Sequence, residues 1–173
     1  MDLFDQAAIF RFHQNLTNEF GKGTTGALGW KLREGQQARF EMLSRIGDLN
    51  HHSVLDAGCG HGDLREFLGT KYHGLRYYGV EQIPSILQEA IDRYDHLPET
   101  YFYEGDFSAA ELPAVDYVLA CGALSYRNSD PLFALKTIQK LFNTARIGLG
   151  FNMLARIEPA GLLEAYHPVY ITE

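Results

Sequence analysis

The 173-residue chain is predicted to fold as one α/β domain, with a parallel sheet covered by helices on both faces. Short apolar runs typical of buried strands alternate along the chain with segments whose apolar residues recur at helical spacing. Hydrophobic residues make up 46% of the chain, enough for a sizeable core. Ligands of such folds bind at the carboxyl ends of the strands, so we expect functional residues in the loops that follow the strands.

Residues 1–50 are expected to form a helical leader ahead of the sheet-forming segment, residues 51–173. The first helix is expected to present one apolar stripe, formed by Phe4, Ala7, Ala8, Phe12, Leu16 and Phe20. Glycines and threonines then indicate a loop over residues 21–31, which contains the only tryptophan, Trp30. A second helix is expected over residues 34–46.

Five apolar runs in the rest of the chain are predicted to be strands: residues 53–58, 75–81, 100–107, 115–124 and 146–154. Helices are expected between them at residues 63–68, 83–94 and 131–142. Asp130 followed by Pro131 indicates the capped start of the last of these helices.

The composition of the chain limits the kinds of binding partner and the cell compartment that we expect. The formal net charge of −7 and the absence of a basic stripe argue against a nucleic-acid partner, because phosphate binding depends on Lys and Arg. Two cysteines are too few for a disulfide framework, which favours a reducing compartment. We find no signal peptide and no apolar run of about 18 residues, so we expect a cytoplasmic protein without a membrane partner.

The run VLDAGCGHGDL, residues 54–64, places three glycines at alternate positions between a predicted strand and a predicted helix. Glycine lets a ligand approach the backbone, and the helix start offers free N–H groups and a partial positive charge. A plain strand-to-helix turn needs one glycine and rarely three. A ligand-binding loop is therefore favoured over a turn.

This run resembles the first motif of class I S-adenosylmethionine-dependent methyltransferases, and weaker matches extend the resemblance from about Ser53 to Phe151. It implies a Rossmann-like sheet, S-adenosylmethionine as cofactor and methyl transfer. The acidic charge favours a small-molecule acceptor, and no His/Cys/Asp cluster has the spacing of a metal site, so no metal is expected. The segment GALGWKLREGQQARF resembles the leader of a bacterial subgroup, which closes over the cofactor. The cofactor-binding residues that the resemblance implies are Trp30, Arg39, Asp56, Gly58, Cys59, Gly60, Gly62, Glu81, Gln82, Ile83, Asp106, Phe107 and Cys121.

The resemblance also suggests roles for some of these residues. Glu81, at the end of the second strand, is placed to bind both ribose hydroxyls, since one carboxylate can accept two hydrogen bonds from a cis-diol. Asp106 and Phe107 are placed against the adenine, with a helix cap as the alternative for Asp106. Trp30 and Arg39 are expected in the lid, where Arg39 would pair with the methionine carboxylate. The alternative for Trp30 is core packing, and the alternative for Arg39 is a position on the helix surface.

No catalytic residue is assigned from the sequence. His61 and Tyr126 are the available bases, and we expect His61 to point to solvent. Two other functions stay open. One is an S-adenosylmethionine-binding protein without turnover. The other is a nicotinamide-dependent oxidoreductase, against which the glycine spacing and the missing Tyr-x-x-x-Lys argue.

The chain ends soon after the fifth predicted strand, so the usual full C-terminal antiparallel strand pair is not expected. A helix is expected over residues 158–166 and one strand over residues 168–172. Either the chain is truncated or something covers the open sheet edge. We expect residues 152–173 to fold back on that edge or to pair with a second copy of the chain as a homodimer, because they are rich in apolar side chains.

Overall fold

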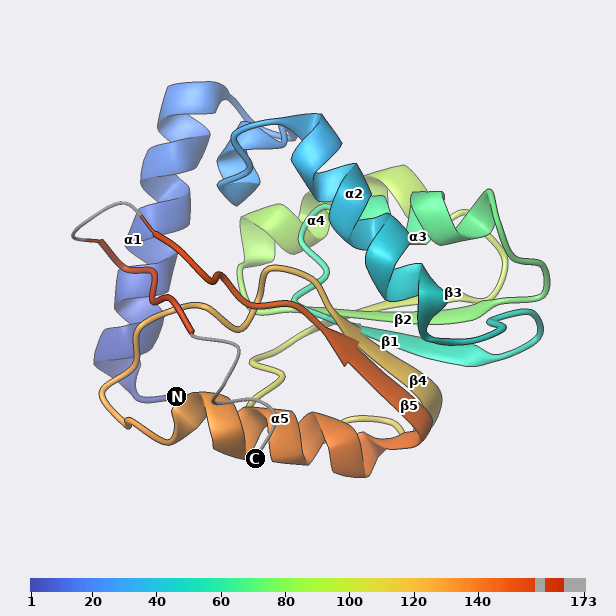
Figure 1. The fold of residues 1–173 in the computed structure, drawn as a ribbon. Helices are drawn as coiled ribbons and strands as arrows, with labels where there is room; N and C mark the ends of the chain where they lie inside the picture. Colours follow the sequence, from blue (N-terminus) through green and yellow to red (C-terminus); the bar gives the residue numbers. More distant parts are fainter. Residues whose placement is uncertain (158–160, 167–173) are drawn as a thin grey trace.

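The computed structural model describes residues 1–157 and 161–166 (Figure 1). Its centre is a five-stranded sheet in the order β3-β2-β1-β4-β5, with every neighbouring pair parallel. The strands are β1 (Ser53–Ala57), β2 (Arg76–Glu81), β3 (Thr100–Glu104), β4 (Val115–Ala120) and β5 (Ala145–Phe151). The Rossmann-like parallel sheet predicted from the sequence is therefore confirmed.

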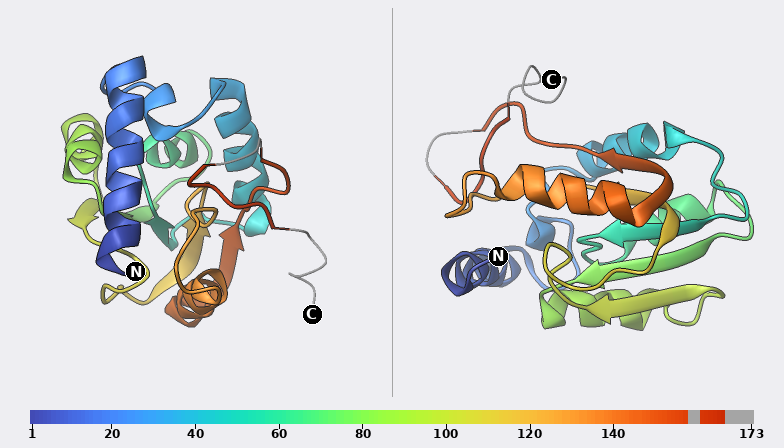
Figure 2. Two further views of the ribbon diagram at one scale, coloured as in Figure 1. Left: turned by 90° about the vertical axis from the view of Figure 1, so that its left-hand side faces the viewer. Right: turned by 90° about the horizontal axis from the view of Figure 1, so that it is seen from below.

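Helices cover both faces of the sheet and one of its ends (Figures 1 and 2). They are α1 (Leu3–Phe20), α2 (Arg33–Leu43), α3 (Asp63–Gly69), α4 (Pro84–Tyr94) and α5 (Phe133–Thr144), with short 3-10 helices η1 (Gly26–Leu28) and η2 (Ser44–Ile46). The helices α2, α3 and α4 lie on one face and α5 lies on the other, while α1 stands across the carboxyl ends of the strands (Figure 1). Strand order reverses between β1 and β4, so a ligand site is expected beneath α1.

The sheet separates two hydrophobic cores. Toward α2 and α3, the side chains of Phe40, Leu68 and Tyr77 belong to one buried cluster. Toward α5, Val118 and Leu141 belong to the other. This division follows from the alternation of side chains along each strand, which sends successive residues to opposite faces.

The predicted apolar stripe of α1 is confirmed only in part, since Ala8, Phe12 and Leu16 are half-buried and its other members are exposed. The helix buries Ile9 and His13, whereas Phe4 is 87% exposed. Ile9 packs on Ile83 and Ile86 beyond the end of β2, so the loops that α1 meets decide which of its faces is buried. The aromatic residues of α1 offered several possible stripes, and spacing alone did not distinguish them.

The start of α5 also differs from the prediction. The helix begins at Phe133, two residues later than expected, and its N-cap residue is Leu132. The carboxylate of Asp130 accepts the backbone N–H of Leu132 at 2.9 Å and therefore closes a turn before the helix instead of capping it. Asp is favoured in both settings for the same reason, which is why the pattern misplaced the boundary.

The described part of the C-terminal segment, residues 161–166, contains no helix, which corrects the helix expected there. Leu163 forms an antiparallel bridge with Tyr126, and the carbonyl of Leu162 accepts the N–H of Arg127 at 2.7 Å. These residues therefore fold back on the loop after β4. The strand expected over residues 168–172 lies outside the described residues.

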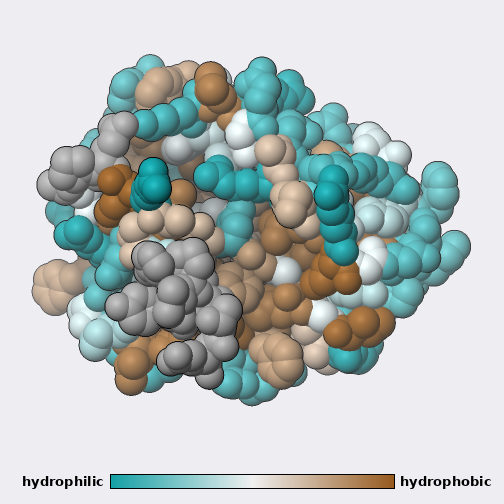
Figure 3. Space-filling model, in the orientation of Figure 1, coloured by the Kyte–Doolittle hydropathy of each residue, from teal (hydrophilic) through white to brown (hydrophobic). Residues whose placement is uncertain are grey.

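The strand β5 forms an edge of the sheet, and apolar side chains gather over it (Figure 3). Ile147 of β5 is 57% exposed. Among residues 1–157 and 161–166, no helix has the length and apolar character needed to cross a membrane.

We expect Leu141→Ala to lower the free energy of unfolding by about 2–5 kcal/mol, because it opens a cavity in the core beneath α5, where Leu141 is fully buried. Leu135→Ala on the same helix is the matched control, since Leu135 is 60% exposed, and should change the free energy by about 0.5 kcal/mol or less. Urea denaturation measures both. Equal effects of the two substitutions would contradict the assignment of this core.

Candidate functional site

The glycine loop after β1 adopts backbone conformations that other residues rarely reach. Gly58, Gly60 and Gly62 have φ values of 78°, 57° and 79°. At Gly62, the N-cap of α3, an added Cβ would lie 2.8 Å from the ring of Tyr94. The turn itself therefore requires all three glycines, which corrects the expectation that a strand-to-helix turn needs only one. This turn brings the loop backbone to the carboxyl end of the sheet.

The carboxylate of Glu81 joins this loop to the end of β2. Its Oε2 accepts the N–H of Gly60 at 3.1 Å, and its Oε1 accepts the N–H of Ile83 at 3.0 Å. Glu81 is buried, and burial raises the pKa of its carboxyl above the ordinary value, against the lowering effect of these hydrogen bonds. Each oxygen keeps capacity for a further hydrogen bond, so the carboxylate can accept from a ligand.

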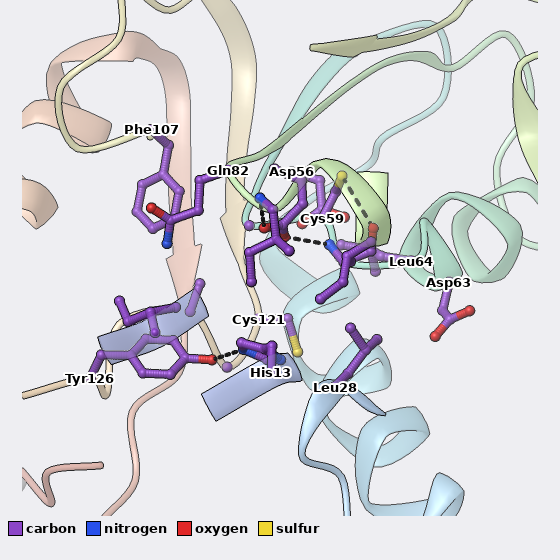
Figure 4. Close-up of a pocket in the computed structure, with 18 of the residues that line it drawn as sticks. His13, Leu28, Asp56, Cys59, Asp63, Leu64, Gln82, Phe107, Cys121 and Tyr126 are labelled. Atoms are coloured by element: carbon purple, nitrogen blue, oxygen red, sulfur yellow. Dashed lines mark hydrogen bonds between the residues drawn. The ribbon is translucent and has the colours of Figure 1, made fainter. Parts of the chain in front are cut away.

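A cavity lies between the glycine loop, the ends of β1, β2 and β4, and the leader segment (Figure 4). It encloses about 90 Å³. The structure brings most of the predicted cofactor residues together in its wall: Trp30, Asp56, Gly58, Cys59, Gly60, Glu81, Gln82, Ile83, Phe107 and Cys121. The side-chain oxygen of Gln82 is buried there without a hydrogen-bond partner in the described structure, which leaves an acceptor for a ligand.

Three predicted cofactor residues do not line this cavity. Gly62 begins α3. Asp106 uses Oδ1 to accept the N–H of Ser108 at 2.8 Å, while its Oδ2 lies 3.4 Å from the amino group of Met1. Residues 107–109 form a turn, so the helix cap considered for Asp106 is wrong. Arg39 holds its guanidinium over the ring of Trp30, 4.7 Å from the ring centroid, and both residues line a neighbouring cavity.

The leader contributes residues that sequence reasoning did not identify. The side chain of Leu28 covers Gly60, reaching 3.1 Å from the position of an added Cβ. Ile9 and His13 of α1 line the same cavity. His13 was missed because the predicted stripe of α1 turned it away from the sheet, and a lone histidine in an amphipathic helix gives no other signal.

His61 is 2% exposed, so the expectation that it points to solvent is wrong. Its Nδ1 has no hydrogen-bond partner within the described structure, and burial lowers the pKa of its ring. The residue is not among those that line the cavity at Glu81. The tight turn of the glycine loop, which the sequence did not reveal in detail, sends its side chain inward.

Asp56 is the second buried acid of the cavity. The hydroxyl of Tyr77 donates to its Oδ2 at 2.6 Å, but burial raises the pKa of Asp56 to about 7. Within the described structure, neither Asp56 nor Glu81 forms an ion pair with a cationic side chain. The cavity therefore suits a ligand that brings hydroxyl donors or a positive charge.

The neighbouring cavity is larger, at about 530 Å³. It shares Leu28, Trp30, Gly122 and Tyr126 with the first cavity, so the two volumes meet at these side chains. The described part of its wall comes from the leader, from the loop after β4 and from the segment after β5. Only the larger cavity has the volume of a small-molecule pocket as it stands.

A family model described as a methyltransferase domain matches residues 55–144. This match covers more than half of the chain, so the chain belongs to the methyltransferase-domain family. It includes the glycine loop and the six elements from α3 to α5.

Curated relatives match over a shorter segment. The trans-aconitate 2-methyltransferases of Paracidovorax citrulli and Delftia acidovorans are 33% and 32% identical over 69 residues, which is 40% of this chain. The matched segment spans about a quarter of the length of these relatives.

Solved structures share the fold. Magnesium protoporphyrin IX methyltransferase from Synechocystis, with bound S-adenosylhomocysteine, superposes with a TM-score of 0.75 at 18% identity, covering 96% of this chain and 85% of that chain. Phosphoethanolamine N-methyltransferase 1 from Haemonchus contortus superposes with a TM-score of 0.73 at 17% identity, covering 99% of this chain and 40% of that chain.

The raised pKa of Asp56 makes stability depend on pH. The folded state holds this proton up to about pH 7, whereas the unfolded chain releases it near the ordinary pKa of 3.8. The Asp56 contribution to the free energy of unfolding should therefore fall by about 4 kcal/mol as the pH rises from about 4 to 7. Asp56→Asn keeps an acceptor for Tyr77 and removes this dependence. Urea denaturation of both proteins without ligand measures the free energy of unfolding at each pH. If this free energy changes with pH in the same way for both proteins, the prediction is contradicted.

Proposed function

We propose that this chain binds S-adenosylmethionine in the cavity at Glu81 and catalyses transfer of its methyl group to a small-molecule acceptor. The observation that carries the proposal is the buried Glu81 carboxylate, held by the backbone N–H groups of Gly60 and Ile83 beside the glycine loop. Membership of the methyltransferase-domain family supports it. So does the fold shared with methyltransferases solved with bound S-adenosylhomocysteine.

The residues present suit the parts of this cofactor. Glu81 would accept hydrogen bonds from the ribose hydroxyls, and Gly58 and Gly60 line the same cavity beside it. Phe107 and Ile83 would pack around the adenine, with the unpartnered oxygen of Gln82 as a further acceptor. The negative charge of Glu81, and of Asp56 when ionised, favours the sulfonium cation of the cofactor over its neutral product.

S-adenosylmethionine supplies a methyl group already activated on sulfur, so the protein mainly has to orient the two reactants and exclude water. Proximity and orientation can contribute about 7–11 kcal/mol to such a reaction. The adjoining cavity shares Trp30, Gly122 and Tyr126 with the cofactor cavity. An acceptor bound in the adjoining cavity would lie beside the transferred methyl group at this junction.

The leader, residues 1–50, would act as a lid on the domain formed by residues 51–173. The cavity at Glu81 encloses about 90 Å³, below the roughly 300 Å³ of the smaller ligand pockets. Leu28 stands directly over Gly60, so the leader has to move for the cofactor to enter. Trp30 and Arg39 move with it. We place this activity in the cytoplasm, because two cysteines are too few for a disulfide framework, and without a nucleic-acid partner, because the chain is acidic.

We expect Glu81→Gln to weaken binding of S-adenosylhomocysteine by about 1.5–3 kcal/mol, because it removes the charged acceptor of the ribose hydroxyls. Glu104→Gln is the matched control. Glu104 is the register partner of Glu81 on β3 but is exposed, and its substitution should leave affinity unchanged. Isothermal titration calorimetry measures both variants.

The same titration distinguishes the other functions. Binding of S-adenosylhomocysteine without binding of NAD supports the proposal, and binding of NAD alone would refute it. Unchanged affinity in a folded Glu81→Gln protein would remove the ribose assignment.

A further inference from the structure

A hydrogen-bonded pair, His13 and Tyr126, stands at the junction of the two cavities (Figure 4). Nδ1 of His13 lies 3.1 Å from the carbonyl oxygen of Ala27, which can only accept, so Nδ1 carries a proton. In the neutral ring Nε2 is then an acceptor, and the Tyr126 hydroxyl donates to it at 2.7 Å. The hydroxyl oxygen of Tyr126 keeps its own acceptor capacity for another molecule.

The location of the pair connects it with both reactants. Tyr126 lines the cofactor cavity and the adjoining cavity, whereas His13 lines the cofactor cavity from the leader. His13 is 6% exposed, and burial lowers the pKa of its ring, so the ring is neutral near neutral pH and free to take a proton. The Glu81 carboxylate is close enough to act electrostatically on Tyr126 and would favour a positive charge on His13.

The adjoining cavity favours one kind of acceptor. Its volume of about 530 Å³ suits a small organic molecule, and apolar side chains such as Phe12, Leu32 and Met153 form much of its wall. Arg39 lies in this wall over Trp30, and it forms no ion pair with any described residue. A cationic amine is disfavoured beside this guanidinium, whereas an oxygen that gains negative charge is stabilised.

We propose that the adjoining cavity binds a small apolar molecule with an acidic hydroxyl, of the phenol class, and that Tyr126 with His13 accepts the proton of that hydroxyl during methylation. This inference rests on the proposed methyl transfer. The acceptor oxygen bonds to the methyl carbon as the carbon–sulfur bond breaks, with its electron pair left on sulfur. The acceptor proton passes to the Tyr126 oxygen while the Tyr126 proton passes to Nε2 of His13. The positive charge thus moves from sulfur to the imidazolium.

Three probes of similar shape test the acceptor class: 2-naphthol, the cationic 2-(aminomethyl)naphthalene and 2-naphthoate, each incubated with the protein and S-adenosylmethionine. We expect the naphthol to be methylated in preference to the others. Preference for the naphthoate, which has no proton to remove, or for the amine would overturn the proposal. So would binding of S-adenosylhomocysteine without methylation of any of the three. If the protein does not bind S-adenosylhomocysteine in calorimetry, the proposed function itself is refuted.

Two variants test the pair. Tyr126→Phe removes the hydroxyl, and His13→Asn keeps a donor for Ala27 while losing the acceptor. Both should lower kcat for phenol by about 100-fold or more. Both should lose much less with 4-nitrophenol, which is already ionised in mildly alkaline buffer and needs no base. Tyr101→Phe, at an exposed position, is the matched control and should change neither rate.

The contrast between the two phenols distinguishes proton transfer from a structural role. Equal losses with phenol and 4-nitrophenol would mean that the pair only supports the fold, and would overturn its assignment. Full activity of Tyr126→Phe on phenol would overturn it as well. Unchanged S-adenosylhomocysteine binding in calorimetry shows that each variant keeps its cofactor cavity.

Discussion

The buried carboxylate of Glu81 is the interaction on which the site depends. Parallel pairing of β1 with β2 sets Ala57 beside Val80, so the loops that follow these strands leave the sheet side by side. Glu81 accepts one backbone N–H from each loop, from Gly60 and from Ile83. The carboxylate thereby fixes the shape of the glycine loop and of the start of α4 together. It remains buried, which raises the pKa of its carboxyl, and is therefore disposed to accept hydroxyl donors from a ligand.

The cavity contains a second buried acid besides Glu81. Asp56 of β1 is held by the hydroxyl of Tyr77 of β2, a second contact across the same pair of strands. Two buried acids in one cavity raise each other's cost of ionisation. A protein of this size can tolerate such an arrangement because backbone and tyrosine hydrogen bonds offset part of the desolvation. The part of the desolvation cost that these hydrogen bonds do not offset can be offset by a ligand that brings positive charge.

The leader turns an open sheet end into an enclosed site. Arg93 of α4 donates to the carbonyl of Gly23 at 2.6 Å and so attaches the leader loop to the body of the domain. Beyond this attachment, Leu28 covers the glycine loop and His13 meets Tyr126. The site is therefore assembled from three separate parts of the chain: the leader, the loops after β1 and β2, and the loop after β4. Movement of the leader would change the cofactor cavity and the adjoining cavity together.

The sequence alone determined the order of strands and helices, the parallel sheet and the positions of the glycine loop and Glu81. These depend on local patterns, such as apolar runs, glycines that need a left-handed backbone, and the alternation that forces parallel pairing. Only the tertiary structure decided that α1 buries His13, that His61 turns inward and that Arg39 stands over Trp30. Each of these depends on which distant segment a side chain meets. Because one helix can bury any of several faces, spacing within the helix does not specify the contact, and packing against the loops after β2 and β4 does.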